Sequence, residues 1–132
     1  MYKINEIHYH FLLETLFESA VKISYDDHIG LIVLYTDNYD YTKSLTKYRP
    51  KCRVMCPIND FSHYHYVRLF RCVTPFFTES NDLTYYNEKL FLEMIEYAKF
   101  VNQLHNKYIL IINAYAEKKF LFNNGMFFRQ ID

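Results

Sequence analysis

The chain of 132 residues carries 15 Lys and Arg against 15 Asp and Glu, so its formal net charge is zero. Its length suits a single domain spanning residues 1–132, and a hydrophobic fraction of 51% excludes an intrinsically disordered chain. The apolar runs are too short to cross a bilayer, and residues 1–15 show no secretory signal. Three cysteines, an odd number, argue against a disulfide framework, so a cytoplasmic protein is expected.

The first half of the chain alternates helical and strand patterns. Residues 12–23 place apolar side chains three to four positions apart, which predicts a helix with one apolar stripe. The continuous aliphatic run at 30–35 is typical of a strand buried on both faces. A short helix is expected at 41–48, with Asp40 as its cap, and a second strand at 51–56.

The second half continues the alternation. A helix capped by Asn59 or Asp60 is expected to run to about residue 70, and the longest helix to cover residues 84–105. Pro57 and Pro75 are expected to close the strands that they follow. Strands and helices that alternate along the whole chain predict a layered α/β domain with helices on both faces of the sheet. The three further strands are expected at 72–74, 107–113 and 126–131.

Three short motifs resemble the C-terminal domain of pyruvate kinase. The sequence Lys-Tyr-Arg-Pro-Lys-Cys at 47–52 is similar to the Lys/Arg-Tyr-Arg-Pro stretch of that family. Leu-Phe-Arg-Cys-Val-Thr-Pro at 69–75 is similar to its Leu-Tyr-Arg-Gly-Val-x-Pro, and Asn-Gly-Met at 124–126 resembles its final hairpin. The resemblance covers nearly the whole chain. It implies a three-layer α/β sandwich: a five-stranded, mostly parallel sheet with an antiparallel C-terminal edge strand, flanked by about five helices.

The same resemblance implies what the chain lacks. In that family a separate catalytic barrel holds the Mg²⁺, K⁺ and phosphoenolpyruvate sites, and none of those ligands can be located in this sequence. We therefore expect no catalytic residue, no metal and no cofactor. The resemblance predicts a stand-alone, degenerate copy of the C-terminal domain, which is a pseudoenzyme rather than an enzyme.

The family binds phosphorylated effectors in a Ser/Thr-rich loop after the first strand, where N–H groups and hydroxyls cradle a phosphate. In this chain two carboxylates would face the phosphate, and like charges repel. The second effector loop, rich in glycine in the family, has none here at 116–120. We expect this effector site to be degenerate. Its residues are Thr36, Asp37, Asn38, Asp40, Lys118 and Lys119.

The C-terminal domain of that family also packs against its twin, through its first helix and last strand. The strand expected at 126–131 is an apolar edge, whose free backbone groups invite pairing. Neighbouring side chains on a strand point to opposite faces, so Phe127 and Phe128 cannot both face one layer of helices. Residues 1–13 add more apolar surface than one helical stripe buries. The candidate partner interface comprises Tyr2, Ile4, Ile7, Phe11, Met126, Phe127, Phe128 and Arg129.

Other chemistry is disfavoured by the spacing of the residues. A zinc site built from Cys52, Cys56 and the His-Tyr-His motifs at 8–10 and 63–65 is disfavoured, because two histidines two positions apart diverge by about 200° on a helix. Cys72 has no base specified near it, so an inert buried thiol is expected. No Gly-rich or P-loop motif marks a nucleotide site.

The expected function is therefore protein interaction. The first hypothesis is an accessory or regulatory subunit that docks on a separately encoded catalytic pyruvate kinase, or on a second copy of itself. The alternative is a domain recruited as a binding or dormancy factor on another large assembly, such as the ribosome. A third and weaker hypothesis is a small-molecule phosphate sensor. Zero net charge and the lack of a recognition motif argue against specific nucleic-acid binding, and no membrane partner is expected.

Overall fold

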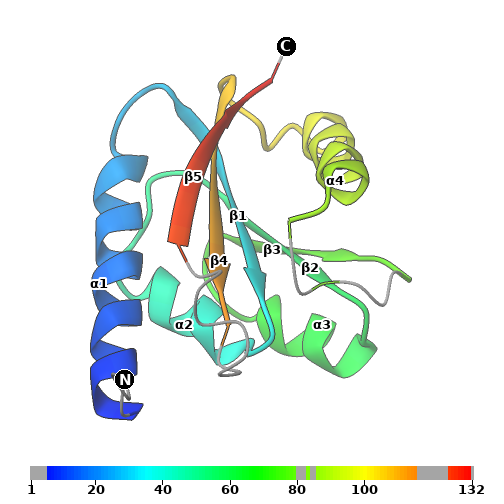
Figure 1. Ribbon diagram of the computed structural model, residues 1–132. Helices are drawn as coiled ribbons and strands as arrows, with labels where there is room; N and C mark the ends of the chain where they lie inside the picture. The colour runs from blue at the N-terminus through cyan, green and yellow to red at the C-terminus, as the bar shows by residue number, and fades with distance from the viewer. Residues whose placement is uncertain (1–5, 80–82, 84–85, 116–124, 132) are drawn as a thin grey trace.

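The computed structural model describes residues 6–79, 83, 86–115 and 125–131, with side chains from residue 11 onward. Helices and strands alternate from residue 6 to residue 114, and the next described element is a further strand (Figure 1). The helices are α1 (Glu6–Ser24), α2 (Asp40–Thr46), α3 (Phe61–Val67) and α4 (Glu88–Phe100). The strands are β1 (Ile29–Thr36), β2 (Val54–Ile58), β3 (Val73–Phe77), β4 (Tyr108–Ala114) and β5 (Gly125–Gln130).

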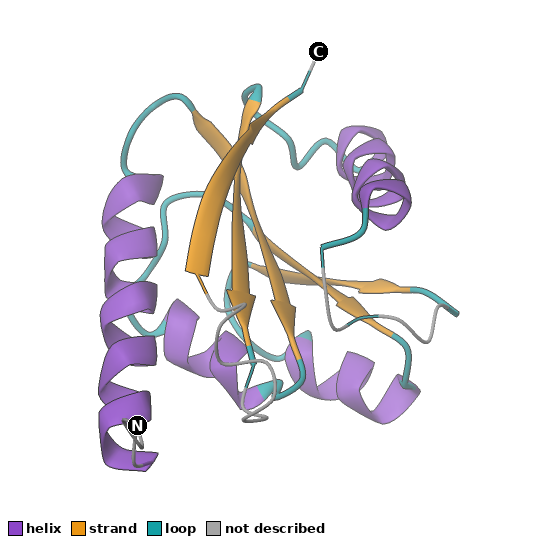
Figure 2. Ribbon diagram, in the orientation of Figure 1, coloured by secondary structure: helices purple, strands orange, loops and turns teal. Residues whose placement is uncertain are grey.

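The strands form one sheet in the order β3-β2-β1-β4-β5. The first four strands are parallel to one another, and β5 pairs antiparallel with β4 at the edge. Helices α1, α2 and α3 cover one face and α4 covers the other (Figure 2). The α/β fold expected from the sequence, with its antiparallel C-terminal edge strand, is confirmed. Four helices, rather than about five, lie within the described ranges.

The core forms two layers because neighbouring side chains of a strand point to opposite faces. On β1, Ile32 and Leu34 face the three-helix layer, whereas Leu31 and Val33 face α4, and all four are fully buried. Burial on both faces explains why this strand is a continuous aliphatic run in the sequence. The described ranges contain no helix with the length and apolarity that crossing a membrane requires.

Two expectations about proline were wrong. β2 and β3 run through Pro57 and Pro75 instead of ending before them. Val54 N–H donates to Cys72 O and Thr78 N–H donates to Ile58 O, so the even-numbered residues of β3 face β2. The N–H that Pro75 lacks would therefore point to the free edge, where no ladder hydrogen bond is lost. Pro57 faces β1 instead, and the pairing of β1 with β2 ends before it, at Met55.

Several helix and strand boundaries also differ from expectation. Helix α1 begins at Glu6 rather than residue 12, β2 begins at Val54 rather than residue 51, and α4 is shorter than 84–105 at both ends. Asp60 caps α3 as expected, accepting hydrogen bonds from the backbone N–H groups of Ser62 and His63. Asp40 is not a cap but the first residue of α2.

Candidate interaction surface

The backbone of β5 offers a free edge. Ile131 N–H donates to Lys107 O at 2.8 Å, which fixes the odd-numbered residues of the strand as those that bond to β4. The N–H and C=O groups of the even-numbered residues therefore point away from the sheet. These residues are Met126, Phe128 and Gln130. Because β5 is the last strand of the sheet, no described strand pairs with them.

The side chains of β5 divide between the two faces. Phe128 lies opposite Leu110 on the α1 face and is 56% exposed, and Met126 packs on the same side. Phe127 faces α4, where its ring meets Tyr86 edge-on at 5.3 Å between centroids. Phe127 and Phe128 thus lie on opposite faces. The described groups leave Phe128 more than half open to solvent.

Arg129 is held on the α4 face by partners within the chain. Its guanidinium forms an ion pair with the Glu88 carboxylate, donates to Tyr86 Oη at 2.7 Å and lies over the Phe91 ring. The hydrogen bonds from Arg129 and Tyr86 lower the pKa of Glu88. Burial, with the hydrogen bond to Glu88, raises the pKa of Tyr86 to about 12. This network fastens α4 to the outer strand.

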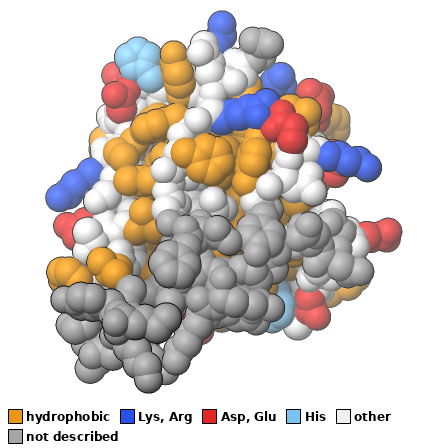
Figure 3. All heavy atoms as spheres, viewed as in Figure 1, with side chains coloured by type: hydrophobic (Ala, Val, Ile, Leu, Met, Phe, Trp, Pro, Cys, Tyr) orange, Lys and Arg blue, Asp and Glu red, His pale blue; other side chains and the backbone are white. Residues whose placement is uncertain are grey.

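Helix α1 runs beside β5, and apolar side chains gather over the two elements on the face seen in Figure 3. Its buried side chains recur at helical spacing and pack on the sheet. Leu16 and Ile23 are half-buried at the border of this stripe. Phe11 and Leu12, at 69% and 52%, are exposed toward the N-terminal end of the helix. The buried stripe comprises Leu13, Phe17, Ala20 and Val21.

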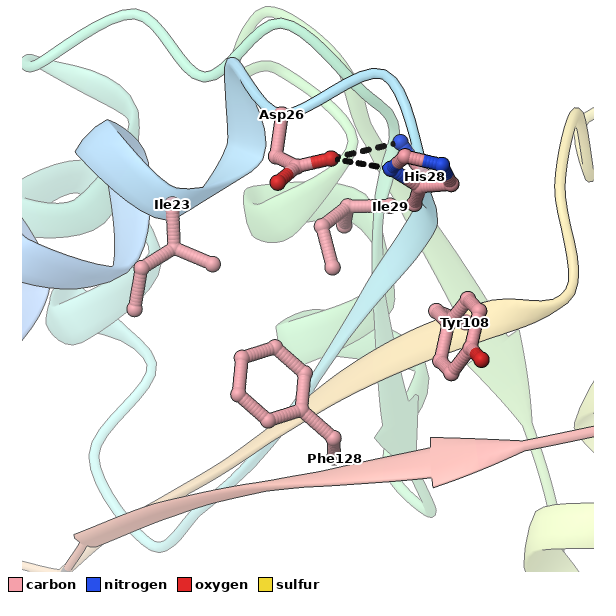
Figure 4. A pocket seen from close by; sticks show the side chains of 6 residues that line it. All are labelled: Ile23, Asp26, His28, Ile29, Tyr108 and Phe128. Carbon is pink, nitrogen blue, oxygen red and sulfur yellow. Dashed lines mark hydrogen bonds and ion pairs between the residues drawn. The ribbon is translucent and has the colours of Figure 1, made fainter.

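A pocket of about 480 Å³ opens beside Phe128, where α1 ends and β1 and β4 begin. Ile23, Ile29 and Tyr108 form its other apolar walls, and their side chains surround the hollow in Figure 4. Asp26 and His28 form the polar rim.

The rim is held in place by two hydrogen bonds. Asp26 Oδ1 accepts from the backbone N–H of His28 at 2.9 Å and lies 2.8 Å from His28 Nδ1. These bonds lower the pKa of Asp26, so its carboxylate is charged at neutral pH. The sequence marks this place only as a polar turn after a helix. No pattern in the sequence indicates that Tyr108 and Phe128, which are far along the chain, lie beside this turn.

The expected effector loop lies at the opposite end of β1. Thr36 Oγ1 accepts from Asn38 N–H at 3.0 Å, Asn38 Oδ1 accepts from Asp40 N–H at 3.1 Å, and Asn38 O accepts from Tyr41 N–H at 3.0 Å. Three N–H groups of this turn are therefore already bonded within the chain. A bound phosphate would have to displace these bonds to use them.

The carboxylates of Asp37 and Asp40 are both exposed on this turn. Tyr66 Oη donates to Asp40 Oδ1 at 2.5 Å, which ties the loop to α3. The Tyr39 ring packs against His63 with centroids 4.6 Å apart, and burial raises the pKa of Tyr39. The loop is thus acidic at Asp37 and Asp40 and fixed by its own contacts.

Five candidate residues lie wholly or partly outside the described residues. Tyr2, Ile4, Lys118 and Lys119 lie outside the described residues, and Ile7 is described only as part of the α1 backbone. The structure brings Phe128 close to Ile23 at the C-terminal end of α1, and Met126 packs against the core on the same face. It places Phe127 and Arg129 on the other face of the sheet.

The cysteines form no metal centre with other side chains of the described residues. In the described ranges no group of three or more His, Cys, Asp or Glu side chains could hold a metal ion. Cys52, Cys56 and Cys72 are free thiols. Burial raises the pKa of Cys52 to about 12 and also raises that of Cys72, so both stay protonated at neutral pH.

Comparison with known proteins identifies the fold. No protein-family model and no curated protein matches the sequence. Two crystal structures of pyruvate kinase from Cryptosporidium parvum match, each with a TM-score of 0.73. The first is 16% identical in sequence, and the match covers 94% of this chain and 26% of the pyruvate kinase chain. The second is 15% identical, and the match covers 100% of this chain and 24% of the pyruvate kinase chain.

The chain spans about a quarter of the length of the pyruvate kinases that it matches. The described residues form one sheet with its helices, and none of them belongs to a barrel. This chain has the fold of the C-terminal domain of pyruvate kinase, as its sequence motifs predict.

Proposed function

We propose that this protein is a non-catalytic protein-interaction module and that α1 and β5 form its binding surface. The observation that carries the proposal is the open edge of β5, where the backbone groups of Met126, Phe128 and Gln130 point outward. Natural proteins usually protect such edges with charged residues, prolines or bulges. The three outward-facing residues include no charge and no proline.

The partner that suits this surface is either a catalytic pyruvate kinase subunit or a second copy of the chain. The fold supports this choice, because the resembled domain joins its subunits through the same two elements. An accessory or regulatory role follows, in which the chain changes the assembly of the enzyme rather than its chemistry.

The proposal includes loss of the phosphate effector site. The bonded N–H groups at Asn38, Asp40 and Tyr41 and the carboxylate of Asp37 support it. Isothermal titration with fructose 1,6-bisphosphate tests it. We expect no binding in the micromolar range, and a micromolar dissociation constant would contradict the proposal.

Sedimentation velocity tests the interaction itself. The protein is run alone and mixed with the pyruvate kinase of its own source, together with two variants. Gln130→Pro removes one outward N–H from β5, and Leu92→Asp alters an exposed side chain on α4, on the opposite face. We expect association for the natural protein and for Leu92→Asp, and its loss in Gln130→Pro. Association that both variants retain, or no association at all, would contradict the proposed surface.

A further inference from the structure

The pocket and the free edge of β5 form one continuous surface. Phe128 belongs to both, because its backbone groups point outward and its ring forms one wall of the pocket. A strand paired to this edge would turn alternate side chains toward α1. One of those side chains would lie next to Phe128, at the mouth of a hollow whose walls are mostly apolar. The shape of the surface therefore selects an extended segment with an apolar side chain at that position.

The rim of the pocket adds a charge. Among the described residues, only His28 bonds to the Asp26 carboxylate, and it engages a single oxygen, Oδ1. Two lysines on the adjoining elements already have carboxylate partners, Lys22 with Glu18 and Lys51 with Asp27. The second carboxylate oxygen can thus accept a cation supplied from outside.

We propose that the pocket binds an apolar side chain of an extended partner segment that pairs with β5, and that a Lys or Arg two residues away pairs with Asp26. The apolar residue and the basic residue are two positions apart because both side chains must face α1, and side chains alternate between the faces of a strand. This inference rests on the proposed function, in which β5 binds protein, and it names the chemistry of the partner.

A second copy of this chain does not fit that description. On the α1 face its β5 carries Met126, Phe128 and Gln130, none of which is basic. Its one basic residue, Arg129, lies on the other face and is held by Glu88. Pairing of β5 with the β5 of a second copy is therefore excluded, which leaves a different chain as the source of the segment, the first of the two partners proposed above.

Two peptides test the inference against the ¹⁵N-labelled full chain by nuclear magnetic resonance. One is Thr-Thr-Phe-Thr-Arg-Thr-Thr, and the other has Glu in place of Arg. We expect both to shift the amide signals of residues 126–130, with the Arg peptide binding about threefold more tightly, the usual size of an exposed ion pair. In Asp26→Asn the two affinities become equal.

Two variants complete the test. Gln130→Pro is expected to weaken both peptides alike, and Leu92→Ser on α4 to change neither. Equal affinities for the natural protein, or shifts confined to another surface, would overturn the inference. If the peptides fail to bind while sedimentation still shows association that depends on Gln130, this inference fails and the proposed function stands. If neither peptide binding nor association is found, both fail.

Discussion

The two edges of this sheet are built differently. On β3 the outward-facing residues are Val73, Pro75 and Phe77, and the proline removes the central outward donor. On β5 the outward-facing residues are Met126, Phe128 and Gln130, and every donor is kept. A proline in an edge strand blocks the approach of another strand. The β3 edge is therefore protected against pairing, and the β5 edge is open to it.

The largest difference in stability is expected between alanine substitutions at Leu110 and at Phe128. These two residues lie opposite each other in neighbouring strands, on the α1 face of the sheet. Leu110 is fully buried, so Leu110→Ala should cost about 2–5 kcal/mol of unfolding free energy. Phe128→Ala should cost less than about 1.5 kcal/mol, because more than half of the ring is already in water. Urea denaturation of both variants measures the difference. Equal losses would show that Phe128 serves the core rather than a partner.

The next largest difference is expected between two proline substitutions in β5, one at a position that bonds to β4 and one at a position that points outward. Phe127 donates its N–H to β4, so Phe127→Pro leaves a carbonyl of β4 unpaired and should cost about 2 kcal/mol or more. Gln130→Pro removes only an outward donor and should cost less than about 1 kcal/mol. The free energy of unfolding in urea distinguishes them. A large loss in Gln130→Pro would mean that the assigned direction of its N–H is wrong.

The protected edge can be opened by one substitution. Pro75→Val restores the outward donor on β3, and we expect concentration-dependent self-association, measured by light scattering. Pro57→Val is the matched control, because residue 57 faces β1 inside the sheet and so adds no donor to the free edge of β3. An unchanged mass for Pro75→Val would show that the proline does not protect this edge.

The smallest expected effect concerns the rim of the pocket. Hydrogen bonds from His28 hold the pKa of Asp26 below its unfolded value, so the bonds add stability above that unfolded value, which is about 3.9. This stability is lost as the pH falls through the lower pKa of the folded state. The difference in melting temperature between the natural protein and Asp26→Asn should therefore shrink from pH 7 to pH 3. A difference independent of pH would contradict the role of the charge.

The fold could be predicted from the sequence because two local signals agreed. The aliphatic run of β1 and the apolar stripe of α1 indicate a sheet covered by helices. The motifs around Arg49 and Arg71 indicate the particular arrangement found in the C-terminal domain of pyruvate kinase. The expectation that Pro57 and Pro75 end their strands was wrong because a sequence does not show which side of a strand faces a neighbouring strand. That direction depends on pairing and becomes visible only in the sheet.

The pocket could not be predicted for a related reason. Ile23 and His28 are near each other in the chain, but Tyr108 and Phe128 reach them only through the pairing of β1 with β4 and of β4 with β5. The interface expectation placed Phe11 and Phe128 in one group. The structure instead makes the C-terminal end of α1, at Ile23, the neighbour of Phe128.

Amide hydrogen exchange on β5, in the free protein and in its complex with a partner, tests the open edge most directly. In the free protein the amides of Phe127 and Arg129 should exchange slowly and those of Phe128 and Gln130 quickly. In the complex all four should exchange slowly, because a bound strand takes up the outward donors. Fast exchange at Phe128 and Gln130 in a fully formed complex would contradict the proposal that this edge binds the partner.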